Sequence, residues 1–133
     1  MNGVPDWAEQ IIRTLARERR CRLPIVRWRN ISRYQNTAGS WDADKNQMNI
    51  TAGWSKLSQR RVLCHESAHW LTNDGHNRMK FWLTLWQLYR RFKVPIKYAL
   101  HWEAASKQMA LKGYWASRDR RGRRPTDTVK IVT

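Results

Sequence analysis

The sequence predicts an α+β fold: an N-terminal helix, a small sheet, and further helices toward the C-terminal end. Three observations predict it. Apolar residues recur at helical spacing near the N-terminus, short segments in the first half alternate polar with apolar residues, and the second half returns to helical spacing with broad apolar faces. The chain has 133 residues, the size of one ordinary domain.

The first half of the chain predicts one helix and about three strands. We expect a helix from Trp7 to about Arg20, because apolar residues there share one face. Residues 25–28 are rich in β-branched side chains and predict a strand. Gly39–Trp41 and Gln47–Thr51 are predicted to pair as a hairpin, with the polar residues 42–46 forming its turn.

The second half predicts three helices. Ser58 is a credible N-cap for a helix from Gln59 to about Thr72, which the αL-tolerant residues 73–75 would end. A long helix is expected from about Arg78 to Phe92 and a last one from Tyr98 to Leu111, ended by Gly113.

The charge balance predicts a polyanionic partner. Lys and Arg number 26 against 10 Asp and Glu, for a net charge of +16. Such a surface attracts polyanions by counterion release and long-range steering, and nucleic acid is favoured over an anionic membrane surface. Residues 117–133 are predicted to form a flexible basic tail, which leaves residues 1–116 as the folded domain. The candidate nucleic-acid contacts in this tail are Arg118, Arg120, Arg121, Arg123 and Arg124.

The cysteines and the N-terminus favour a cytoplasmic protein. Cys21 and Cys64 are too few for a disulfide scaffold and form no C-x-x-C pair, so we expect reduced thiols. The first ten residues are polar and contain no apolar core of a signal peptide. No segment has the apolar length of a transmembrane helix, so no membrane association is expected.

Residues 65–69 read His-Glu-Ser-Ala-His, which is H-E-x-x-H in the middle of a predicted helix. Residues four apart lie on one helical face, so His65 and His69 can converge on one metal ion. Glu66 follows the first histidine, and its carboxylate can reach a water molecule that the metal activates. The pattern therefore predicts one zinc ion, with Glu66 as the general base.

A catalytic zinc site usually has three protein ligands, so the sequence must supply a third. His76 is favoured, because it follows a helix stop that can fold the chain back toward the metal. Two alternatives stay open. Glu103 lies on the predicted last helix, where a later glutamate could complete the site, and His101 is a reserve ligand or a neighbour of the ligands.

From about Leu57 to Phe92 the chain resembles the SprT-like metallopeptidases, the family that includes the DNA-dependent protease Spartan. The resemblance is carried by residues 62–70, Val-Leu-Cys-His-Glu-Ser-Ala-His-Trp, then Asp74-Gly75-His76, then Phe81-Trp82. It implies a zincin-like fold, with His76 as the third zinc ligand. Small phage and actinobacterial metallohydrolases share the pattern. The chain has no four-cysteine zinc ribbon, so nucleic-acid contact is expected from arginines instead.

The first functional hypothesis is a zinc metallopeptidase of a bacterium or a phage-infected cell, acting on proteins near nucleic acid. If the resemblance holds, an extended peptide would pair with an edge strand, for which Gln47–Thr51 is the candidate. Donors that could stabilise the oxyanion are Tyr98, His101 and Tyr114. The alternatives are a nucleic-acid-binding module with a structural or vestigial zinc site, and a metal-dependent hydrolase of a non-peptide bond.

Overall fold

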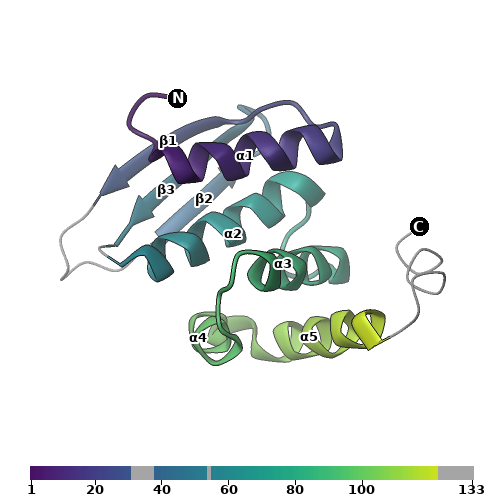
Figure 1. Cartoon of the computed structure of the whole chain (residues 1–133). Coiled ribbons are helices and arrows are strands. Elements are labelled where there is room, and N and C mark those ends of the chain that lie inside the picture. Colours follow the sequence, from purple (N-terminus) through teal and green to yellow (C-terminus); the bar gives the residue numbers. More distant parts are fainter. Residues whose placement is uncertain (31–37, 54, 123–133) are drawn as a thin grey trace.

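The computed structural model describes residues 1–30, 38–53 and 55–122 (Figure 1). That part of the chain forms five α-helices, one short 3-10 turn and a three-stranded sheet, which confirms the α+β prediction. None of these helices is long and apolar enough to cross a bilayer. In chain order the elements are α1 (Asp6–Arg19), β1 (Ile25–Asn30), β2 (Ala38–Asp42), β3 (Gln47–Ala52), α2 (Lys56–Thr72), α3 (Met79–Arg91), α4 (Ile96–Trp102), η1 (Ala104–Ser106) and α5 (Lys107–Gly122).

The sheet has the strand order β1-β3-β2, so its central strand is the last in sequence. β2 and β3 pair antiparallel, with Trp41 opposite Met48, which confirms the predicted hairpin. β1 pairs with β3 in parallel, with Ile25 opposite Gln47. The expectation that residues 47–51 form an edge strand is therefore wrong. β2 is an outer strand, and within the described residues no strand pairs with its other edge.

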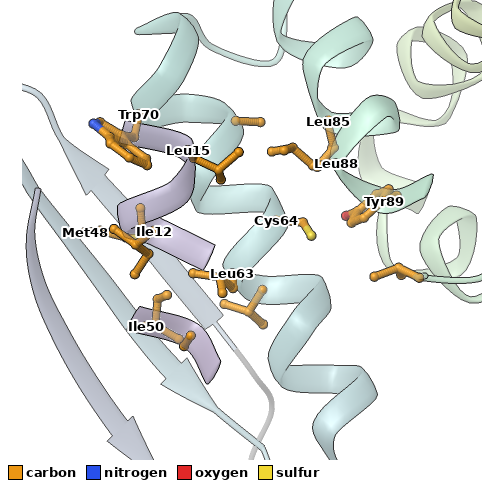
Figure 2. Packing of buried hydrophobic residues seen from close by; sticks show 14 of the residues in the cluster. Ile12, Leu15, Met48, Ile50, Leu63, Cys64, Trp70, Leu85, Leu88 and Tyr89 are labelled. Carbon is orange, nitrogen blue, oxygen red and sulfur yellow. The ribbon is translucent and has the colours of Figure 1, made fainter. Parts of the chain in front are cut away.

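One face of the sheet carries the core. Met48, Ile50 and Ala52 of β3 are buried at every second position, as strand alternation requires. They pack against α2 and α1. Leu63 of α2 and Ile12 of α1 belong to the same buried cluster (Figure 2). α3 packs on α2 and α5 packs on α3, so the helices form successive layers away from the sheet (Figure 1). α2 lies inside this stack and is buried on most of its circumference.

Local hydrogen bonds set the two ends of α2. The Ser55 hydroxyl accepts a hydrogen bond from the Ser58 backbone N–H at 3.0 Å, so Ser55 caps the helix and the prediction of Ser58 as N-cap is wrong. At the other end Asn73 is left-handed, with φ 54°, and its N–H donates to the His69 carbonyl. The predicted stop after Thr72 is confirmed.

The C-terminal helices differ from the prediction. The sequence predicts a single helix over residues 98–111, but α4, η1 and α5 occupy this part of the chain. The α-helices that follow α2 are therefore α3, α4 and α5. α5 runs through Gly113. A side chain at this position would collide with Trp82 of α3, so the glycine lets the two helices approach closely. Residues 117–122, expected in the flexible tail, are helical. The rest of that tail, residues 123–133, lies outside the described residues.

Candidate metal centre

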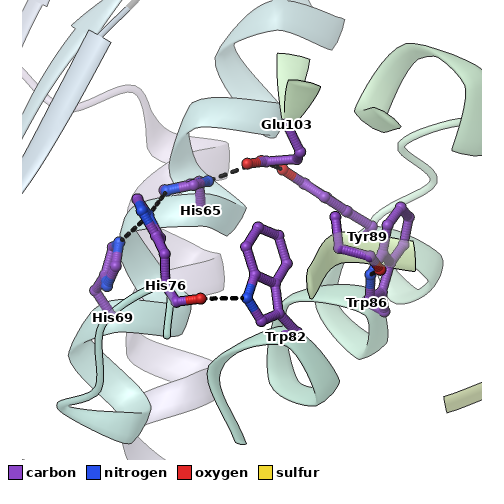
Figure 3. Close-up of polar contacts among 8 residues, drawn as sticks. His65, His69, His76, Trp82, Trp86, Tyr89 and Glu103 are labelled. Atoms are coloured by element: carbon purple, nitrogen blue, oxygen red, sulfur yellow. Dashed lines mark hydrogen bonds and ion pairs between the residues drawn. The ribbon is translucent and has the colours of Figure 1, made fainter. Parts of the chain in front are cut away.

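Three histidine side chains converge at the end of α2 (Figure 3). His65 and His69 project from α2 one turn apart, and His76 comes from the loop that follows the helix. His76 Nε2 lies 3.0 Å from Nε2 of His65 and 3.0 Å from Nε2 of His69. Nitrogens that share a zinc ion at 2.0–2.1 Å are roughly 3.3 Å apart in a tetrahedron, so these spacings suit one metal ion. The three predicted histidines can therefore hold a metal together.

The far nitrogen of His69 shows which ring nitrogen is free for a metal. His69 Nδ1 lies 2.8 Å from the backbone oxygen of Asp74. A carbonyl oxygen only accepts, so Nδ1 carries the proton and Nε2 keeps its lone pair. Burial lowers the pKa of His69 to about 4, so the ring is neutral near pH 7. Burial also lowers the pKa of His76, with the charge of His65 acting in the same direction.

Glu103 contacts His65 on the side of the ring away from the other histidines (Figure 3). Its Oε1 lies 2.8 Å from His65 Nδ1 and accepts a hydrogen bond from the Tyr89 hydroxyl at 2.6 Å. Burial alone would raise the pKa of Glu103, but the hydrogen bonds that its carboxylate accepts from His65 and Tyr89 hold that pKa below its usual value. The carboxylate of Glu103, which the sequence offered as a third ligand, is thus a hydrogen-bond partner of one of the three histidines.

Two aromatic residues at the start of α3 support the histidines. The buried Phe81 ring stacks on His69 with centroids 4.2 Å apart, and it contacts the rings of His76 and His65 at 5.1 and 5.3 Å. The Trp82 indole N–H donates to the backbone oxygen of His76 at 2.8 Å (Figure 3). The loop that carries His76 is therefore held against α3 by the Trp82 hydrogen bond and by the Phe81 ring contacts.

Glu66 lies between α2 and the outer strand. Its side chain is 5% exposed and rests against Gly39 of β2. Burial raises the pKa of Glu66 to about 7. Glu66 and the three histidines line a cavity of about 350 Å³, the metal-site hollow, whose opposite wall comes from β2 and the loop after α2. The remaining lining residues are Gly39, Ser40, Trp41, Ala43, Asn73, Asp74 and Gly75.

Other residues singled out from the sequence lie elsewhere. His101 is exposed on α4, where its ring contacts Trp102, and it does not join the histidine group. The Tyr114 hydroxyl accepts a hydrogen bond from Arg118 on α5. Among the described residues that line the metal-site hollow, none is Tyr98, His101 or Tyr114, so the structure does not support these three as oxyanion donors.

The structure describes only part of the predicted arginine group. Arg118 is exposed, with its guanidinium 5.7 Å from the ring centre of the exposed Trp115. Arg120 and Arg121 belong to the last turn of α5. Arg123 and Arg124 lie outside the described residues. Only Arg118 is therefore placed on a defined surface.

Comparisons of the chain with protein-family models, with curated proteins and with solved structures found no match. The likeness to SprT-like metallopeptidases therefore rests on the motif residues alone.

Proposed function

We propose that this protein is a zinc metallopeptidase of the SprT-like kind. His65, His69 and His76 hold one zinc ion, and Glu66 is the general base. The observation that carries the proposal is the convergence of three imidazole Nε2 atoms beside a buried carboxylate in one hollow.

The number of donors supports a catalytic site over a structural one. Structural zinc sites are usually closed by four protein ligands, whereas catalytic sites have three and an open position. Among the described residues, no fourth histidine, cysteine or acidic side chain joins the three histidines. A structural site would also have no use for a carboxylate buried in the wall of the hollow.

The residues have separate roles in the proposed reaction. Zinc, when bound, supplies a Lewis acid that polarises the scissile carbonyl and brings the pKa of water toward about 7. Glu66 accepts the proton of the attacking water and delivers it to the leaving amine nitrogen as the peptide C–N bond breaks. The hydrogen bond between His69 and Asp74 keeps that imidazole in one orientation throughout.

The outer strand β2 supports a peptide as the substrate. Gly39, Ser40 and Trp41 of β2 line the metal-site hollow, and the outer edge of this strand pairs with no described strand. An extended peptide can add to such an edge through backbone hydrogen bonds, which would bring a peptide bond alongside the histidines. β2 thus takes the role that the sequence assigned to residues 47–51.

The partner side of the proposal is nucleic acid, which would hold the enzyme near bound proteins. It is supported by the net charge of +16 and by Trp115, which is 57% exposed and has Arg118 beside it. Exposed aromatic rings stack on bases, and arginines bind phosphates. A nucleic-acid-binding module that does not cleave proteins is the second candidate, favoured by the same charge.

The test is a cleavage assay on the full chain loaded with zinc, using labelled casein with and without DNA. Glu66→Gln should still bind one zinc ion and lose hydrolysis by about 10²-fold or more, the scale of general acid–base catalysis. Glu9→Gln, the same change at a half-buried glutamate on α1 that does not line the hollow, should leave hydrolysis unchanged. Undiminished cleavage by Glu66→Gln would refute the mechanism. Salt-dependent DNA binding without cleavage by the unaltered protein would favour the second candidate.

A further inference from the structure

We propose that Glu103 is a positioning residue, which acts through Nδ1 of His65 to keep the lone pair of that ring on Nε2, and that the Tyr89 hydroxyl fixes the carboxylate. The inference rests on the metal-binding part of the proposed function. It does not require that the protein cleave peptides.

The two nitrogens of the His65 ring have different neighbours. A neutral imidazole carries one proton, which can sit on either nitrogen, and a nitrogen that carries the proton cannot bind a metal. His65 Nε2 faces the other histidines, and His65 Nδ1 lies 2.8 Å from Glu103 Oε1. A carboxylate only accepts hydrogen bonds, so this contact places the proton on Nδ1 and leaves Nε2 free.

The carboxylate is itself held in place. Glu103 follows the last residue of α4 and is 5% exposed, and Tyr89 of α3 is 1% exposed. Glu103 Oε1 accepts the 2.6 Å hydrogen bond from the Tyr89 hydroxyl and also contacts His65 Nδ1 (Figure 3). Side chains from α2, α3 and the end of α4 therefore meet at this carboxylate. The positions are far apart in sequence, so the contact depends on the packing of α3 and α4 around α2.

The cost of burying this carboxylate supports a functional role. A buried carboxylate loses its hydration, and well-packed apolar side chains in its place are often as stable or more so. Packing alone would therefore favour an apolar residue at position 103. The structure instead keeps a charge whose accepted hydrogen bonds come from a metal-site histidine and from a tyrosine on the next helix.

The histidines also differ in the acceptor at Nδ1. His69 Nδ1 donates to a neutral backbone carbonyl, whereas His65 Nδ1 donates to a carboxylate. A charged acceptor makes the stronger hydrogen bond and raises the basicity of the opposite nitrogen. The bond between His65 Nε2 and the metal should therefore be strengthened by the charge of Glu103.

Two substitutions at position 103 separate the acceptor from its charge. Glu103→Leu removes the acceptor at similar volume, while Glu103→Gln keeps a neutral acceptor. Tyr89→Phe removes only the hydroxyl that fixes the carboxylate. Tyr114→Phe is the matched control, because that hydroxyl bonds Arg118 on α5. Each full chain would be examined at pH 8 for folding by circular dichroism, for ring tautomers by long-range ¹⁵N–¹H NMR without metal, and for zinc affinity by competition with a chromophoric chelator.

In the unaltered protein we expect His65 with its proton on Nδ1. Glu103→Leu should show a mixture of tautomers and bind zinc about 10–100-fold more weakly, the usual effect of losing such a partner. Glu103→Gln should keep the tautomer and bind zinc with intermediate affinity, and so remains informative if the leucine variant does not fold. Tyr89→Phe should weaken zinc binding in the same direction by a smaller factor, and Tyr114→Phe should not change it.

Two results would overturn the inference. One is a His65 ring with its proton on Nε2 in the unaltered protein, and the other is unchanged zinc affinity in both Glu103 variants. If the peptidase assignment is wrong, the measurements give a different result. A protein with the expected tautomer and zinc affinities that cleaves no peptide would support the role of Glu103 and contradict only the enzymatic assignment.

Discussion

Gly39 of β2 and Glu66 of α2 lie so close together that no side chain fits between them. A Cβ atom at position 39 would lie 2.6 Å from both Cγ and Oε2 of Glu66, well inside the roughly 3.5–4.0 Å at which carbon atoms pack. The outer strand therefore forms the wall against which the proposed general base rests. This contact places the proposed peptide-binding edge directly beside the proposed proton-transfer group.

Gly39→Ala should consequently impair hydrolysis while preserving the metal. The added methyl group displaces Glu66, and a misplacement of about 1 Å can cost roughly 10²-fold in rate. One zinc ion should still bind per chain, because the substitution leaves the three histidine side chains unaltered. Steady-state cleavage of labelled casein and elemental analysis measure the two effects. Lys45→Ala, a truncation at an exposed position of the β2–β3 turn outside the hollow, is the control. A Gly39→Ala enzyme as active as its parent would contradict the account.

The three histidines should be individually necessary for the metal. Replacing His65, His69 or His76 by alanine removes one of three converging donors, so the purified variant should retain almost no zinc after dialysis. His101→Ala changes an exposed histidine on α4 and should retain one zinc ion per chain. Inductively coupled plasma mass spectrometry gives the stoichiometry. A His76→Ala protein that keeps its zinc would exclude this residue as a ligand.

The two thiols should differ sharply in reactivity. Cys64 faces the core from α2 and is 3% exposed, and burial raises its pKa to about 12, so almost no thiolate forms near pH 8. Cys21 is only half-buried. A chromogenic disulfide reagent should label one thiol in the folded protein and two in denaturant. Rapid labelling of Cys64 without denaturant would show that α2 is less tightly packed than described here.

Gly113→Ala should destabilise the fold although alanine favours helices. The added Cβ would collide with Cβ of Trp82 and approach Trp86, and such overpacking costs about 1–3 kcal/mol. Urea unfolding followed by tryptophan fluorescence measures the loss. Lys112→Ala changes the neighbouring exposed position and should remain within about 0.5 kcal/mol of the parent protein. A stabilised Gly113→Ala protein would indicate that α3 and α5 are further apart.

Local patterns predicted much of the fold and the grouping of the three histidines. The β2–β3 hairpin follows from alternation on both sides of a polar turn, and the stop at Asn73 from residues that tolerate the left-handed conformation. The histidines could be grouped because His65 and His69 are one helical turn apart and His76 follows directly after that stop. Each of these relationships spans few residues, so the sequence carries most of the information.

Most of the errors concern contacts between residues distant in sequence, whereas the N-cap of α2, expected at Ser58 and found at Ser55, is a local error. From its neighbours in sequence, Gly113 is expected to end a helix. The structure shows instead that glycine at this position makes room for Trp82 of α3. The central place of β3 depends on its parallel pairing with β1, which no local signal specifies. Glu103 was weighed as a ligand, because nothing near it in sequence shows that it contacts the outer nitrogen of His65.

X-ray absorption at the zinc edge of the purified, zinc-loaded chain tests the central claim most directly. The account predicts three imidazole nitrogens at about 2.0–2.1 Å, with the remaining coordination supplied by water oxygen. A shell with fewer than three imidazoles, or with sulfur, would contradict it, as would a protein that binds no zinc.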